Sequence, residues 1–304
     1  MRILFFTSEA EDYLQDQALI GLRGLFGESV VDYPKKDVLY EACKKTGAEL
    51  YGCGFTIWKI LPDININRDN IYQRIAQNEF DIIVFSSIWR QKSFFRQVCL
   101  RFLFLRSSAK LVFLDGEDFQ KTYIPALFFG KYYKRELASF VGRKFTEQIS
   151  FSIPDNKIAL FEEEKRKMFA KHVQCEEAYK IAEVKENCSH SYAFSDESAY
   201  YKDIASSYYA ITMKKAGWDC MRHYEIAGNG TVPCFYQFSS KPDYCAPHGF
   251  IDMHNMLVFN TADELLEKIG WIEKNNRYAD IRANALKWAK ANSCTQIAGK
   301  VLDN

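Results

Sequence analysis

The chain has 304 residues, of which 48% are hydrophobic, 15% aromatic and 26% charged, and its formal net charge is +1. This length suits one large or two ordinary domains with substantial cores, and the balanced charge excludes the strongly basic surface of most nucleic-acid-binding proteins. Nine cysteines without a CxxC pair indicate neither a disulfide framework nor a zinc site. We therefore expect a protein of the reducing cytoplasm, without a signal peptide or a membrane span.

The N-terminal half alternates predicted strands with predicted helices. Short apolar runs predict strands at Arg2–Thr7, Ser29–Tyr33, Phe80–Ser86 and Lys110–Leu114. Helices are expected at Glu9–Phe26, Lys35–Lys45, Asp69–Asn78 and Arg90–Leu105, the first of them starting from a capping box of Ser8 and Glu11. Gly47–Asn67 is rich in glycine and reads as a loop that faces a ligand. The alternation predicts a parallel, doubly wound α/β sheet.

Three carboxylates, Asp115, Glu117 and Asp118, follow the last of these strands directly. This position is the carboxyl edge of the predicted sheet, and crowded carboxylates raise one another's pKa, which suits a general base. A turn that caps a helix is an equally good interpretation, because Asp-Gly is a common turn pair. Asp12, after the first strand, could face the same place, although a plain helix cap is the simpler explanation.

Two segments, Phe94–Leu105 and Phe128–Arg135, mix aromatic residues with arginine and lysine. Such segments can lie on a membrane surface. We favour core helices with solvated basic edges, since amphipathic helices are common in globular proteins. A peripheral membrane contact remains the alternative, and it would suit a lipid-linked substrate.

Pro154, Asp155 and Asn156 mark a turn, and we place a domain boundary there, giving domains 1–153 and 154–304. The charged stretch Lys157–Gln174 predicts a solvated helix, and the polar stretch Glu183–Ser191 predicts a loop. The following residues, up to Ser207, include three tyrosines: Tyr192, Tyr200 and Tyr201.

The stretch Tyr208–Tyr236 predicts a strand, a loop, a helix capped by Asp219 and a second strand. Lys214 and Lys215 in the loop, with Arg222 at the helix start, form a suitable seat for phosphate at the carboxyl edge of a parallel sheet. Arg222 and Glu225 share one helix face, which fits either a surface ion pair or a diphosphate and ribose site.

The C-terminal stretch predicts a pocket-shaping loop at Phe238–Gly249, a strand at Met256–Phe259, and two helices, one from Thr261 to Asn275 and one at Arg277–Ala291. His248, Asp252 and His254 have no recognised metal-ligand spacing. We therefore expect no metal site.

The run from Ala216 to Phe235, AGWDCMRHYEIAGNGTVPCF, resembles the nucleotide-sugar half of GT-B glycosyltransferases. It is most similar to small bacterial enzymes linked with surface polysaccharides, and more distantly to spore-coat glycosyltransferase-like proteins. Trp218 and Asp219 stand where the larger GT-B families carry their first glutamate and a glycine-rich loop.

The resemblance implies two Rossmann-like domains that face a cleft, with a terminal helix, here Arg277–Ala291, crossing back to the first domain. It implies Glu225 on the donor ribose and Arg222 near the diphosphate. The full set of predicted donor-binding residues is Lys214, Lys215, Trp218, Arg222, Glu225, Gly228, Asn229 and Gly230.

The sequence thus predicts a metal-independent glycosyltransferase without a cofactor, whose substrates are a nucleotide sugar and a saccharide or lipid-linked acceptor of bacterial surface polysaccharide synthesis. Asp115, Glu117 and Asp118 are the candidate bases if the reaction inverts. We expect the enzyme in the cytoplasm, with the inner membrane face as an alternative site of contact. A non-catalytic nucleotide- or sugar-binding module and a sugar-nucleotide epimerase are the other hypotheses.

Overall fold

A computed structural model of the protein describes residues 1–105, 108–138 and 144–302, without the side chains of residues 100–105. The chain divides into two compact units. The first consists of Met1–Phe151 together with Cys294–Asn304, and the second is Ser152–Ser293. Each unit has its own parallel sheet, so each is described by itself.

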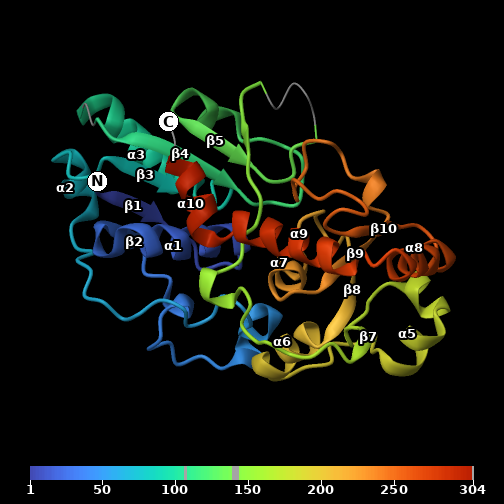
Figure 1. The fold of residues 1–304 in the computed structure, drawn as a ribbon. Coiled ribbons are helices and arrows are strands. Elements are labelled where there is room, and N and C mark those ends of the chain that lie inside the picture. The colour runs from blue at the N-terminus through green and yellow to red at the C-terminus, as the bar shows by residue number, and fades with distance from the viewer. Residues whose placement is uncertain (106–107, 139–143, 303–304) are drawn as a thin grey trace. The chain divides into compact units, whose positions relative to one another are not determined.

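The first unit has a six-stranded sheet in the order β2-β1-β3-β4-β5-β6, and every pair of neighbours is parallel. Figure 1 labels β1 to β5 of this sheet. Its strands are β1 Ile3–Phe6, β2 Val30–Tyr33, β3 Ile82–Phe85, β4 Lys110–Asp115, β5 Lys131–Lys134 and β6 Glu147–Gln148. The α-helices among its described residues are α1 Tyr13–Phe26, α2 Ile71–Ala76, α3 Lys92–Leu105 and α10 Cys294–Leu302. The chain winds outward from β1 in both directions, as in a doubly wound sheet.

The second unit has a four-stranded parallel sheet in the order β10-β9-β8-β7. Its strands are β7 Lys167–Phe169, β8 Ser207–Met213, β9 Val232–Tyr236 and β10 Leu257–Phe259. Its α-helices are α5 Ala182–Asn187, α6 Glu197–Ala205, α7 Met221–Gly228, α8 Ala262–Lys274 and α9 Tyr278–Ala291. The predicted α/β class with parallel sheets is therefore confirmed.

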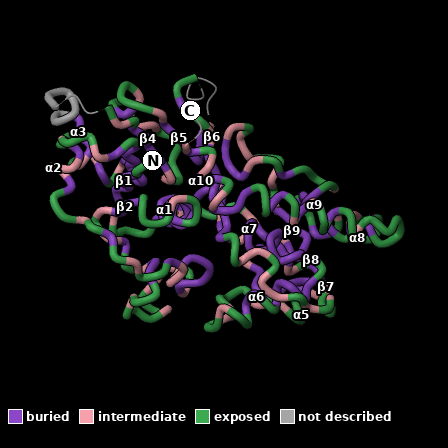
Figure 2. The backbone as a smooth tube through the Cα atoms, turned by 60° about the vertical axis from the view of Figure 1, so that its left-hand side comes forward, coloured by how far each residue is buried: buried purple, intermediate pink, exposed green. Residues whose placement is uncertain are grey.

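Apolar strands form the centre of each unit because both faces of their sheets are covered. All four residues of β1 and all four of β3 are buried, and so are the first four residues of β9. In Figure 2 the backbone at β1 and β9 is coloured as buried, whereas much of α8 is coloured as exposed. None of the described helices is long and apolar enough to cross a membrane.

Two predicted elements of the first unit are wrong, and a third begins later than predicted. Helix α1 starts at Tyr13 rather than at Glu9, and its cap is Asp12, whose carboxylate accepts from the Gln15 backbone N–H at 3.1 Å. Lys35–Lys45 contains only a 3-10 turn, Asp37–Leu39. Within Phe128–Arg135, residues 131–134 form strand β5, because an aromatic pair between lysines fits a sheet position better than a helix. The other basic and aromatic segment lies in α3, and the side chains of its residues 100–105 are outside the described part.

The second unit differs from prediction in its short elements. Lys157–Gln174 is not a helix and contains the three-residue strand β7, whereas the predicted loop at 183–191 begins inside α5. The Arg277–Ala291 helix, expected to cross back, is α9 of the second unit. The segment that returns to the first unit is Cys294–Asn304, which contains the unpredicted helix α10.

Candidate functional site

The predicted strand, loop, helix and strand around residues 208–236 are present as β8, a loop, α7 and β9. Helix α7 is capped at Cys220, so the prediction that Asp219 caps it is wrong. The Asp219 carboxylate instead accepts a hydrogen bond from the Tyr224 hydroxyl at 2.8 Å and is buried. Because α7 follows the parallel strand β8, its first turn lies near the carboxyl end of that strand, where ligands bind in such sheets.

Arg222, in the first turn of α7, lines a small pocket at the carboxyl ends of β7 and β8. His172, Gln174, Thr212, Met213 and Lys215 also line this pocket, whose volume is about 10 Å³. The Arg222 guanidinium donates to the backbone oxygen of His172 and, through Nε, to that of Ile211 at 3.4 Å. These two backbone oxygens hold the positively charged Arg222 side chain at the end of the sheet. We name this set of residues the cationic pocket.

Glu225 lies one helical turn after Arg222 and keeps only 7% of its surface exposed. Its Oε2 accepts from the hydroxyl of Tyr200, which lies on α6, at 2.6 Å. The same hydroxyl lies 3.4 Å from Nη1 of Arg222 and accepts from it. Glu225 and Arg222 are therefore connected through the hydroxyl of a buried tyrosine.

The two predicted lysines are exposed on the loop before α7. Lys214 Nζ lies 5.3 Å from the centre of the Trp218 ring, and that ring stacks on Phe235. Lys215 donates to the side-chain oxygen of Gln174, and desolvation by the residues around its ammonium group, together with the nearby Arg222 charge, lowers its pKa. The loop thus adds positive charge next to the cationic pocket.

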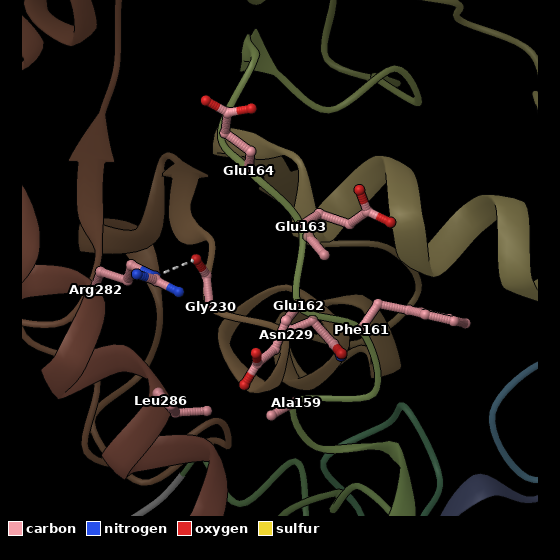
Figure 3. Close-up of a pocket in the computed structure, with 10 residues that line it drawn as sticks. Ala159, Phe161, Glu162, Glu163, Glu164, Asn229, Gly230, Arg282 and Leu286 are labelled. Carbon is pink, nitrogen blue, oxygen red and sulfur yellow. Dashed lines mark hydrogen bonds between the residues drawn. The ribbon is translucent and has the colours of Figure 1, made fainter.

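Gly228, Asn229 and Gly230 lie at the opposite end of α7, about 12 Å along an eight-residue helix, and do not line the cationic pocket. Gly228 packs near Ile153, the Asn229 amide donates to the Lys157 backbone oxygen, and Gly230 adopts a φ of +68°. Figure 3 shows Asn229 and Gly230 at a different cavity of about 440 Å³, where Arg282 donates to the Gly230 oxygen at 2.9 Å. Close packing and a left-handed turn account for the two glycines.

Sequence reasoning missed His172, which follows β7. Its Nδ1 lies 3.1 Å from the Ser191 backbone oxygen, and its ring meets the half-exposed Tyr192 ring edge to face. Burial, and then the charges of Arg222 and Lys215, lower the His172 pKa to about 4. No signal pointed to it, since β7 itself was not predicted. Of the three tyrosines in this region, Tyr200 and Tyr201 are buried, and Tyr192 is exposed.

The first unit has a separate pocket of about 380 Å³ at the carboxyl ends of β1 and β4. Its charged lining, which we name the acidic pocket, consists of Asp12, Arg90, Glu117, Asp118 and Arg135, together with Glu11. Glu117 pairs with Arg90 at 3.2 Å, and Asp118 with Arg135. Burial and the neighbouring carboxylates Asp12 and Asp115 raise the Glu117 pKa, despite the opposing effect of Arg90.

Asp115 is wholly buried beside this pocket and does not line it. One carboxylate oxygen pairs with Lys134 Nζ at 2.8 Å, and the other accepts from Trp89 Nε1 at 2.9 Å and the Tyr132 hydroxyl at 2.5 Å. A buried carboxylate with these three donors holds the ends of β4 and β5 in place and is not accessible to a substrate. The next residue in the chain is Gly116. A Cβ at this position would come within 2.9 Å of Asp12 Oδ1, so glycine fits there best.

Among the described residues, no group of three or more His, Cys, Asp or Glu converges as metal ligands would. Asp252 pairs with Lys268 at 2.8 Å, and His254 lies near Asn284. These side chains therefore have partners of another kind.

No family model matches the chain, and no curated protein matches it. Solved structures do match. The Anabaena protein Alr3699/HepE in complex with UDP aligns with 99% of this chain over 98% of its own, with a TM-score of 0.55 and 11% identity. The same protein with UDP-glucose gives a TM-score of 0.54 and 12% identity over the same shares. A glycosyltransferase from Rickettsia africae aligns with 99% of this chain over 96% of its own, with a TM-score of 0.59 and 10% identity.

At these identities the similarity concerns the fold. The chain has the α/β fold of these solved structures, a GT-B-like fold with two Rossmann-type units, as the Ala216–Phe235 resemblance predicted.

Proposed function

We propose that the protein is a glycosyltransferase that moves a sugar from a nucleotide-sugar donor to a glycan or lipid-linked saccharide in bacterial surface polysaccharide synthesis. The observation that supports this most is the cationic pocket at the carboxyl ends of β7 and β8. It stands on a fold shared with a protein solved with UDP and with UDP-glucose, and ligands of open α/β sheets bind at this edge.

Arg222, Lys214 and Lys215 have the charge and position to bind the donor diphosphate, while Glu225 accepts hydrogen bonds from the ribose hydroxyls. Trp218 lies in the same loop, between β8 and α7. These cations and the start of α7 would stabilise the negative charge of the leaving nucleotide. This is why we propose a reaction without a metal ion.

Glu117 is our candidate for the general base of an inverting transfer. It is partly exposed in the acidic pocket, and its raised pKa makes it a stronger base than an ordinary glutamate. Asp118 is the second candidate, although Arg135 pairs with it. The role we propose for Asp115 is to position the loop that carries both.

Nucleotide titration tests the donor site. We expect Glu225→Ala to weaken binding of the cognate nucleotide about 10- to 100-fold, the range for loss of a charged hydrogen-bonding group. UDP, GDP and CMP are titrated by calorimetry into the wild type, Glu225→Ala and the control Glu267→Ala, an exposed glutamate on α8. Equal affinity of the first two proteins for every nucleotide would remove this assignment.

Donor turnover tests the base. Glu117→Gln should lower the rate of sugar transfer or donor hydrolysis about 10²- to 10⁴-fold without weakening nucleotide binding. Asp118→Asn is the matched comparison, and a loss in that variant alone would move the role to Asp118. Full activity of both variants would contradict an inverting mechanism with this base and leave a retaining enzyme.

The acceptor could be presented at a membrane surface. Ile124 and Phe128 on the turn before β5 are 63% and 81% exposed, and Lys121 precedes them. Protruding apolar residues beside a cation suit the interface of an anionic bilayer. We expect co-sedimentation with vesicles that contain phosphatidylglycerol, reduced by Ile124→Ser with Phe128→Ser but not by Trp271→Ser, which removes an exposed residue of α8. Equal sedimentation of all three proteins would argue against this surface.

A further inference from the structure

Tyr200 occupies a buried position in the second unit that the proposed chemistry does not yet use. It lies on α6, whose start is capped by Asp196, and 4% of its surface is exposed. A tyrosine hydroxyl in such a position needs a hydrogen-bond partner, because leaving it without one costs about 1–3 kcal/mol. In this structure the hydroxyl contacts the two side chains proposed for donor binding.

The direction of these hydrogen bonds follows from chemistry. A guanidinium can only donate, and an ionised carboxylate can only accept. The Tyr200 hydroxyl, 3.4 Å from Arg222 Nη1 and 2.6 Å from Glu225 Oε2, therefore accepts from the first and donates to the second. Burial and the Glu225 charge keep the Tyr200 pKa well above its ordinary value, so the hydroxyl keeps its proton.

We propose that Tyr200 is a positioning residue for the donor, which fixes the Glu225 carboxylate for the ribose and the Arg222 guanidinium for the diphosphate. This inference rests on the proposed function. A carboxylate has about four lone-pair sites, and the short bond from Tyr200 takes one of those on Oε2 and orients the group. Hydrogen bonds that involve charged groups are short and directional, which makes a single hydroxyl an effective guide.

The test compares UDP with 2′-deoxy-UDP, because only UDP offers the 2′-hydroxyl to Glu225. In the wild type we expect UDP to bind more tightly. Tyr200→Phe removes the hydroxyl and keeps the ring, and we expect about a tenfold rise in the Kd for UDP, as loss of a charge-assisted bond produces. The Kd for 2′-deoxy-UDP should rise by a smaller factor, because this nucleotide keeps the diphosphate and the 3′-hydroxyl but has no 2′-hydroxyl, so the preference for ribose should become smaller.

Tyr224→Phe is the matched control, since Tyr224 is a buried tyrosine of α7 whose hydroxyl also donates to a carboxylate, that of Asp219. Like Tyr200→Phe, this variant removes one buried hydroxyl that donates to a carboxylate. It should leave the preference for ribose unchanged. Glu225→Gln provides a second variant if Tyr200→Phe does not fold. It should reduce the ribose preference by a similar factor, and the double variant should show no further loss if the two residues act as one unit.

The outcomes distinguish the proposed function from the positioning role of Tyr200. A wild type that binds no nucleotide contradicts the proposed function itself. A wild type that binds UDP and 2′-deoxy-UDP equally, or a Tyr200→Phe variant that weakens both by the same factor, keeps the donor site but overturns the positioning role. Retention of the wild-type ribose preference by Tyr200→Phe overturns it as well.

Discussion

Burial decides what a carboxylate can do, and Asp115 illustrates this at the scale of one residue. Asp115 and Lys134 form an ion pair in which neither side chain is exposed, and burial lowers the Lys134 pKa while the aspartate charge raises it. Asp115→Asn removes the charge that compensates the buried lysine, so we expect a loss of about 3–5 kcal/mol of unfolding free energy. Urea unfolding would measure it.

The matched variant is Asp118→Asn, which removes a carboxylate that is 49% exposed in its pair with Arg135. The buried Arg135 keeps its pair with Glu136 and its hydrogen bonds to the Gly116 oxygen in this variant, so the loss of unfolding free energy should be smaller than in Asp115→Asn. Equal stability of Asp115→Asn and Asp118→Asn would contradict a structural role for the buried pair.

His172 predicts a pH dependence. Its pKa falls from 6.5 to about 4 on folding because burial and two nearby cations disfavour the charged ring. The unfolded chain then binds more protons between these values, so stability is complete above pH 6.5 and is lost as the pH falls towards 4. The loss at pH 4.5 is about 2–3 kcal/mol. In His172→Gln this component should be absent, so unfolding at pH 4.5 and 7.5 should differ by that much less than in the wild type.

At the scale of elements, Gly21 shows how closely α1 and α10 approach. A Cβ at Gly21 would lie 1.9 Å from the Cys294 backbone oxygen and 2.8 Å from the Ala298 Cβ. Glycine to alanine inside an exposed helix normally stabilises by about 1 kcal/mol, but here the backbones would have to separate. We expect Gly21→Ala to lower the melting temperature. Gly270→Ala in α8, with nothing within 4 Å, should raise it, and a rise in both would contradict this packing.

The sequence predicted most elements with a clear local pattern, but it missed β5, β7, α6 and α10. Segments such as β8, α7 and α8 carry clear apolar periodicity and turn residues, and they formed close to the predicted positions. Strand β7 has three residues and β5 has four, flanked by lysines, and their sheet partners rather than their own pattern determine them. Contacts with neighbouring strands therefore determine the secondary structure of β5 and β7.

The sequence also predicted only part of the candidate site, because a local pattern does not show tertiary contacts. Arg222 and Lys215 do share a pocket at a strand end, as the order of strand, loop and helix indicated. Burial is not visible in a local pattern, so the sequence could not show that Asp115 is enclosed. Nor could it show that Tyr200 would come from another helix to contact Glu225 and Arg222.

At the scale of the whole molecule, the C-terminal segment completes a unit that begins at the other end of the chain. Helix α10 packs on α1, and Ile297, Ala298 and Val301 are buried there, while the Tyr133 hydroxyl donates to the Lys300 backbone oxygen at 2.8 Å. Burying two such aliphatic side chains contributes about 3–6 kcal/mol, which is comparable to the stability of a domain.

Deleting residues 294–304 should therefore destabilise the first unit, although it removes no residue proposed for donor binding or catalysis. Hydrogen exchange followed by mass spectrometry should show faster exchange in β1 and α1, because the apolar face of α1 loses its cover, while residues 152–293 keep their protection. Lys300→Ala, which leaves the backbone acceptor in place, is the control and should exchange like the wild type. Unchanged protection of α1 in the shortened chain would show that the first unit is complete without α10.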